Sequence, residues 1–115
     1  MLVGHLRAGS RASEYIAGLD EPPICSEVTR IEIIQGLRSA ERSAAETLFA
    51  LIEWAPVSEE IARRAGALGR RWRASHPGIG VADLAVAATA EQLGAPLATC
   101  NVRHFPMFAD LQSPY

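Results

Sequence analysis

Short apolar runs alternate along the chain with longer stretches in which apolar residues recur at helical spacing. The apolar runs predict strands at 24–25, 54–57 and 97–100. The helical spacing predicts one or two short helices over about 2–19, and further helices over 26–37, 41–53, 58–75 and from Asp83 to the turn at Gly94. Strands that alternate with helices in this way are typical of an α/β fold with a short parallel sheet.

Two parts of this pattern leave the sheet undefined at its ends. Folds of this kind normally begin with a buried strand, whereas residues 2–19 have helix-like sequence, so we expect the sheet to lack its N-terminal strand. The tail over 105–115 predicts one edge strand. Within the helices, the expected core positions are Val28, Ile31, Ile34, Leu37, Leu48, Leu51 and Ile52.

Composition limits the class of protein. At 115 residues, with 49% hydrophobic content and a net charge of -2, the chain predicts one globular domain. No apolar run approaches the length of a membrane span, and no signal peptide is recognisable, so we expect a cytoplasmic protein without membrane contact. Cys25 and Cys100 lack the spacing of zinc ligands, and each is expected to be a buried free thiol.

All 11 basic residues are arginine. Guanidinium groups make planar, bidentate contacts with phosphate, so any positive surface has that chemistry. The slightly negative net charge nevertheless excludes a protein that coats nucleic acid as a bulk polycation.

Three polar residues stand in apolar surroundings. Asp83 lies at the start of an Ala-rich helix, Glu32 lies between isoleucines, and Asn101 ends the strand that follows Gly94. Polar side chains converge at the carboxyl ends of strands in open α/β folds. Two carboxylates and an amide oxygen are suitable ligands for Mg²⁺ or Mn²⁺.

Structural roles explain the same residues equally well at this point. Glu32 can pair with Arg30 or Arg38 on a solvated face. Asp83 can be a helix-start residue, and Asn101 can be a turn residue. Spacing alone therefore supports only a weak metal hypothesis.

Three sequence blocks resemble those of PIN-domain proteins. Residues 26–36 resemble the block S-x-x-T-x-x-E-x-x-x-G, residues 79–90 resemble D-x-x-I-A-A-T-A, and residues 99–105 resemble T-x-N-x-x-H/D-F. Within that superfamily the chain is most similar to the VapC toxins of bacterial toxin–antitoxin pairs. The resemblance implies a three-layer α/β/α fold and a single PIN-like domain over 1–115, truncated at its N-terminus.

The resemblance also implies an activity, a Mg²⁺- or Mn²⁺-dependent endoribonuclease that hydrolyses RNA phosphodiester bonds. Carried over by position, Glu32 and Asp83 match the metal-binding acids, Asn101 matches a fourth polar position, and Thr99 matches a hydroxyl residue on the same strand end. Implied partners are RNA, a cognate VapB-type antitoxin and a second copy of the chain in a homodimer. Contacts with RNA could come from Arg7, Arg30, Arg38 or Arg103, although surface ion pairs are the ordinary role of such residues.

The start of the chain departs from the family pattern. PIN domains usually open with a strand that ends in a metal-binding Asp, and residues 1–7 resemble what normally follows it. Either the working protein begins upstream, or this chain is metal-impaired. We therefore expect weak or no nuclease activity, and the alternative function is an inactive module that binds the antitoxin or dimerises. A helical adaptor that binds through residues 70–73 is a further reading, although a solvated face with Trp72 in the core explains that run.

Overall fold

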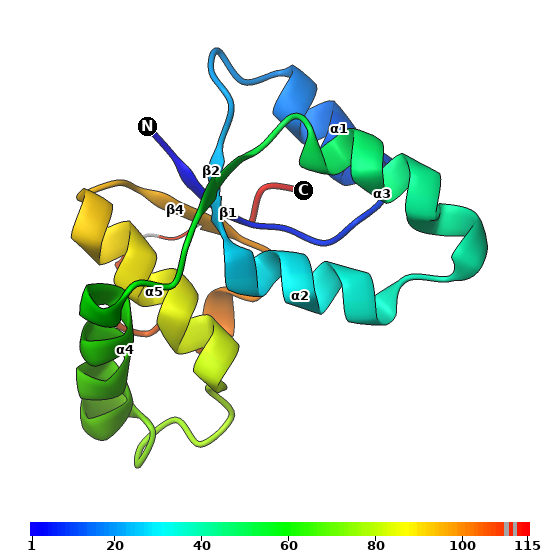
Figure 1. Cartoon of the computed structure of the whole chain (residues 1–115). Helices are drawn as coiled ribbons and strands as arrows, with labels where there is room; N and C mark the ends of the chain where they lie inside the picture. Colours follow the sequence, from blue (N-terminus) through cyan, green and yellow to red (C-terminus); the bar gives the residue numbers. More distant parts are fainter. Residues whose placement is uncertain (110, 112) are drawn as a thin grey trace.

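A parallel sheet forms the centre of the molecule, and the computed structural model describes every residue of the chain except Asp110 and Gln112. All pairings in the sheet are parallel, and the strand order is β3-β2-β1-β4 (Figure 1). The strands are β1 (Val3–His5), β2 (Ile24–Ser26), β3 (Glu53–Ala55) and β4 (Leu97–Thr99). The α/β class and the short parallel sheet are thus confirmed.

Local signals in the sequence define the helices. Their bounds are α1 (Ser10–Ala17), α2 (Glu27–Gly36), α3 (Arg42–Phe49), α4 (Glu59–Trp72) and α5 (Val81–Leu93), with short 3₁₀ turns η1 (Ser39–Glu41) and η2 (Val102–His104). The Ser26 hydroxyl accepts a hydrogen bond from the Val28 N–H, and Ser58 caps α4 by accepting from Ile61. Gly94 ends α5 in the left-handed conformation, with φ 59°.

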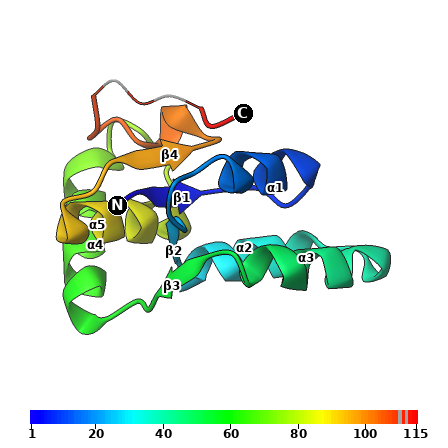
Figure 2. The ribbon, with the colours of Figure 1, turned by 90° about the horizontal axis from the view of Figure 1, so that it is seen from above.

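Two helical layers enclose the sheet (Figures 1 and 2). On the face covered by α4 and α5, Val3, Val86 and Phe105 belong to one buried cluster. On the opposite face, the core is built around Ile16 of α1 and Cys25 of β2, together with Leu48 of α3. The three-layer α/β/α arrangement expected from the resemblance is therefore present.

The N-terminal residues differ from the expectation of an absent strand. Val3–His5 forms β1 in the centre of the sheet, between β2 and β4. The Val3 N–H donates to Pro96 O, and the Ile24 N–H donates to Leu2 O. These bonds satisfy the backbone groups of both neighbouring strands. A three-residue buried strand has no periodicity of its own, which is why the helix-like residues around it concealed it.

Some expected core positions lie on the surface. Ile31 and Ile34 of α2 are 61% and 50% exposed, and Leu51 is 44% exposed. In α2 the buried residues are instead Thr29 and Ile33. Apolar residues surround α2 on several sides, so its sequence does not indicate which face packs against β2 and α5.

The helix predicted over 41–53 is shorter at its C-terminal end than expected. Helix α3 ends at Phe49 because Glu53 already pairs with Ile24 in the sheet. In the tail, the described residues of 105–115 form no strand, and positions 110 and 112 of that prediction lie outside the described residues.

Cys25 is fully buried, as predicted, and burial raises the pKa of its thiol to about 12. Because the thiolate is the reactive form, this cysteine is inert at neutral pH. Cys100 is only half-buried. Across the part of the chain that the structure describes, the helices are too short or too polar for any of them to span a membrane.

Two glycines provide a test of the cap at the end of α5. Substitution Gly94→Ala is expected to lower the free energy of unfolding by about 1 kcal/mol, because alanine is strained at positive φ. Gly66→Ala, in the exposed middle of α4, is the matched control and is expected to raise it by about 0.5–1 kcal/mol. A Cβ meets no atom within 4 Å at either position, so only the backbone conformation differs. Equal effects in chemical denaturation would contradict this interpretation.

Candidate functional site

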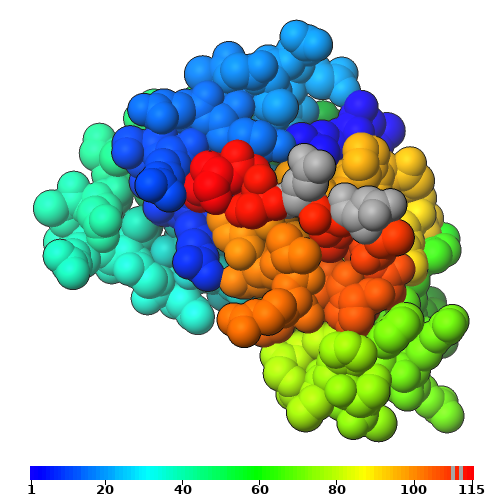
Figure 3. All heavy atoms as spheres, turned by 180° about the vertical axis from the view of Figure 1, so that it is seen from behind, coloured from blue at the N-terminus to red at the C-terminus, as the bar shows by residue number. Residues whose placement is uncertain are grey.

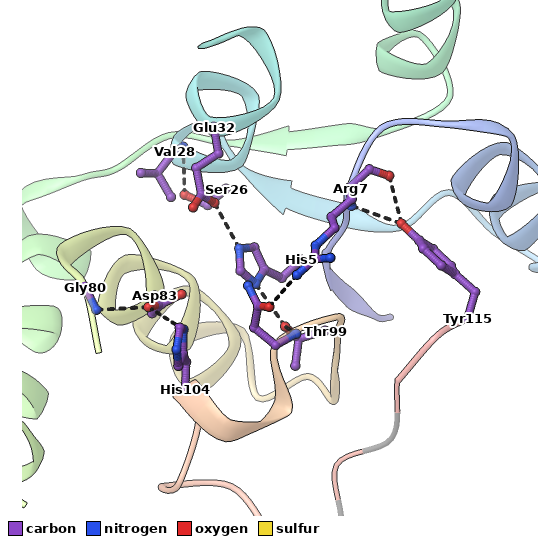
Figure 4. A network of polar contacts seen from close by, with 11 residues as sticks. His5, Arg7, Ser26, Val28, Glu32, Gly80, Asp83, Thr99, His104 and Tyr115 are labelled. Carbon is purple, nitrogen blue, oxygen red and sulfur yellow. Dashed lines mark hydrogen bonds and ion pairs between the residues drawn. The ribbon is translucent and has the colours of Figure 1, made fainter. Parts of the chain in front are cut away.

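A pocket opens at the carboxyl ends of β1 and β4 (Figure 4). Its volume is about 290 Å³. The polar residues that line it come from β1 and the loop after it, from α2 with the turn that follows, and from the segment after β4: His5, Arg7, Glu32, Glu41 and Asn101. Strand ends of a parallel sheet commonly form ligand sites in this way.

His5 lies at the centre of the polar network and is 5% exposed. Its Nε2 is 2.9 Å from Glu32 Oε1, and its Nδ1 is 2.9 Å from Thr99 Oγ1. An ionised carboxylate only accepts hydrogen bonds, so Nε2 carries a proton and donates it to Glu32. In the neutral ring Nδ1 then accepts from the Thr99 hydroxyl. The edge-to-face contact with Phe105, at 5.6 Å between ring centroids, holds the imidazole in place.

Asp83 lies apart from this pair, in the first turn of α5, and is 7% exposed. Its Oδ2 accepts a hydrogen bond of 2.9 Å from the Gly80 N–H, which caps the helix. The same oxygen is 3.2 Å from His104 Nδ1, without the geometry of a hydrogen bond. Figure 4 shows the two side chains facing each other on one side of the network. The helix-start role considered for Asp83 is thus observed, together with a nearby imidazole.

Arg7 closes the other side of the pocket. Its Nη2 donates a hydrogen bond of 2.8 Å to Asn101 Oδ1. The Tyr115 hydroxyl accepts from the Arg7 backbone N–H at 3.0 Å and donates to the Arg7 carbonyl at 2.8 Å. Burial raises the pKa of Tyr115 to about 12, so this hydroxyl remains a donor at neutral pH. Arg7 is therefore fixed at its backbone and at the end of its side chain.

The structure brings only part of the predicted site together. Glu32 and Asn101 line the same pocket. Thr99 does not line it but contacts His5, which does. Asp83 is not among the described residues that line this pocket. The alternative in which Glu32 pairs with Arg30 is contradicted, because Arg30 pairs with Glu27 at 2.6 Å and Glu32 pairs with His5.

The predicted metal ligands do not fit a Mg²⁺ or Mn²⁺ centre as they stand. Glu32 Oε1, Asp83 Oδ2 and Asn101 Oδ1 each already face a donor group of the protein. Within residues 1–109, 111 and 113–115, no three His, Cys, Asp or Glu side chains are placed to hold a metal ion. Hard cations require several converging oxygen ligands, and here one oxygen of each predicted ligand faces an N–H group of the protein instead.

His5 is a site residue that the sequence did not reveal. Residues 2–19 read as helix, so the position of His5 at a strand end was not foreseen. No local signal in the sequence marks His5, because a strand of three buried residues has no periodicity of its own. The side chains of Val3 and His5 are both buried on the α5 side of the sheet, with Val3 in the core and His5 beneath the pocket.

Similarity to known sequences covers almost the whole chain. The PIN domain family matches residues 2–111. "Ribonuclease VapC19" of Mycobacterium tuberculosis is 47% identical over 116 residues, which are 98% of this chain and 93% of that protein. "Ribonuclease VapC10" of the same organism is 44% identical over 117 residues, which are 100% of this chain and 88% of that protein.

Solved structures share the fold. A toxin–antitoxin complex from Klebsiella pneumoniae has a TM-score of 0.71 at 21% identity. The match covers 94% of this chain and 87% of the chain in that complex. VapBC-1 from nontypeable Haemophilus influenzae has a TM-score of 0.69 at 25% identity, and the match covers 98% of this chain and 96% of that chain. The first likeness is one of fold alone, and the second joins fold with weak sequence identity.

Proposed function

Because this chain belongs to the PIN-domain family, we propose that it acts in a VapBC-type toxin–antitoxin system as a ribonuclease toxin. Its substrate is RNA, whose phosphodiester bonds it hydrolyses, and its partner is a VapB-type antitoxin. Two relatives that carry the name ribonuclease VapC support this proposal, each over nearly the full chain. The observation that carries it is the convergence of Glu32, Arg7 and Asn101 in one pocket at the carboxyl ends of the strands.

The residues of this pocket have separate roles in the proposal. Arg7 binds a phosphate oxygen of the RNA, which requires its guanidinium to exchange Asn101 for the phosphate. Glu32 holds a proton-accepting oxygen towards the pocket, and His5 fixes its orientation from below. Thr99 fixes the tautomer of His5. No step is assigned to a metal ion, because the expected ligands do not fit one in this arrangement.

This arrangement supports weak rather than efficient cleavage. One oxygen each of Glu32, Asp83 and Asn101 faces a protein donor, and Asp83 is not among the described residues that line the pocket, so the pocket has little of the clustered negative charge that attracts a hard cation. The same observation favours a second candidate function, a module that binds the antitoxin or forms a homodimer without cleaving RNA. A cytoplasmic location belongs to both candidates as a prediction.

Cleavage of RNA by the purified protein, with and without Mn²⁺, separates the two candidates. The proposal predicts slow cleavage that Glu32→Gln lowers by roughly tenfold or more, the scale of a lost proton acceptor. The matched control is Glu27→Gln, which removes a carboxylate on the same helix that pairs with Arg30 away from the pocket, and it is expected to leave the rate unchanged. If folded wild-type protein binds a VapB-type antitoxin but gives no cleavage under either condition, the second candidate replaces the first.

A further inference from the structure

The C-terminal end of α4 carries a group of arginines outside the pocket. Arg70 and Arg71 lie in the last turn of the helix, and Arg73 follows as its C-cap. All three are exposed, and none forms an ion pair with any residue in the described part of the chain. This group is available for a ligand of negative charge.

The other arginines of α4 differ in this respect. Arg63 pairs with Glu59 at 3.0 Å, and Arg64 pairs with Glu91 at 3.6 Å. Positive charge near a helix C-terminus is favourable by itself, which accounts for one or two basic residues there. That preference explains where the group lies, whereas its lack of acidic partners among the described residues distinguishes it from Arg63 and Arg64.

A fourth arginine belongs to the segment that faces Asp83. Arg103, in η2, is exposed and unpaired among the described residues, and its neighbour His104 faces Asp83 at 3.2 Å. The loop after α4 reaches this place, since a Cβ on Gly78 would lie 3.9 Å from His104 Nε2. The surface view shows the yellow-green segment after α4 directly beside the orange segment that contains η2 (Figure 3).

Aromatic rings accompany the cluster. Trp72 is half-buried, the Arg71 guanidinium lies 5.3 Å from the centre of its ring, and His76 meets it edge to face at 5.7 Å. Unpaired guanidinium groups with partly exposed rings are the combination that binds single-stranded nucleic acid, through phosphate contacts and base stacking. A purely acidic polypeptide would use the charges but not the rings.

We propose that Arg70, Arg71, Arg73 and Arg103 form a docking surface for the backbone of single-stranded RNA and guide it past Asp83 and His104 towards the pocket. This inference rests on the proposed function, because it names where the substrate binds. The surface contributes affinity and leaves the chemistry to the pocket. The arginines of the first half of α4, which are paired with acids, do not take part.

Binding of a fluorescently labelled single-stranded RNA tests the surface without cleavage, in full-length protein that carries Glu32→Gln. The combined change Arg70→Ala, Arg71→Ala and Arg73→Ala is expected to weaken binding at least about tenfold and to lower the slope of log affinity against log salt by about two. The matched control, Arg63→Ala with Arg64→Ala on the same helix, is expected to change affinity less than about twofold. Circular dichroism checks that each variant is folded.

Three results would overturn the inference. If both sets of substitutions weaken binding equally, or neither does, while wild-type protein still cleaves RNA, the surface is not a docking site and the proposed function stands. If polyglutamate displaces the RNA as effectively as unlabelled RNA does, the surface recognises acidic polypeptides instead. A wild-type protein that neither binds nor cleaves RNA removes the proposed function and this inference together.

Discussion

Replacement of His5 by aspartate is expected to strengthen the binding of a divalent cation beside Glu32. The imidazole of His5 donates to Glu32 at 2.9 Å, so an aspartate at the same strand end would place a second carboxylate near that oxygen. Two facing carboxylates repel each other and bind a hard cation in compensation. We expect the affinity for Mn²⁺, measured by titration calorimetry, to rise by roughly tenfold or more and RNA cleavage to rise with it.

His5→Asn separates the two effects of this substitution. Asparagine removes the imidazole without adding charge, so its gain in Mn²⁺ affinity is expected to be clearly smaller than that of His5→Asp. Equal gains would mean that steric opening of the pocket, and not charge, controls cation binding. A wild-type protein that binds Mn²⁺ as tightly as His5→Asp would show that the imidazole does not keep a cation from Glu32.

Truncation of Phe105 is expected to have the largest effect on stability. Phe105 is 1% exposed and lies in the core cluster with Val3, Val86 and other residues. Phe105→Ala is expected to lower the free energy of unfolding by about 3–5 kcal/mol, through lost burial and the remaining cavity. For a domain of marginal stability this is a large fraction of the total. Chemical denaturation measures the change.

Phe105→Leu is the control for this change, because leucine keeps most of the volume. Its cost is expected to stay under about 1.5 kcal/mol. Since the Phe105 ring packs against the His5 ring, a folded Phe105→Leu protein also tests how far this contact positions His5. A cost for Phe105→Ala near that of Phe105→Leu would show that the segment after β4 is not part of the core.

The elements that local sequence specifies are the ones that could be predicted. Helix α4 has a Ser58 cap and a clear apolar stripe, and α5 ends at Gly94, a residue that tolerates the left-handed conformation. Strand β1 could not be predicted in the same way. Its three residues are held by partners distant in the chain, Leu97 to Thr99 on one side and Ile24 on the other.

The residues of the candidate site also fall into those that local sequence indicates and those that it does not. Glu32, Asp83, Asn101 and Thr99 were identifiable because they stand in sequence blocks with local spacing. Their partners were not, since His5 meets Thr99 and Arg7 meets Asn101 across 94 positions of the chain. Those contacts depend on the order of strands in the sheet, which local patterns do not encode. They also decide whether the predicted ligands can face a cation.

His5 lies between Glu32 and Thr99, and the roles proposed for these two residues depend on this. Nitrogen-15 NMR of the histidine side chains in the wild-type protein, during titration with Mg²⁺ to millimolar concentration, observes it without any substitution. We expect His5 to keep a protonated Nε2 bonded to Glu32, with resonances that do not move as Mg²⁺ is added. Resonances of His5 that shift to a saturating end point, as its hydrogen bond to Glu32 breaks in favour of the metal, would contradict it.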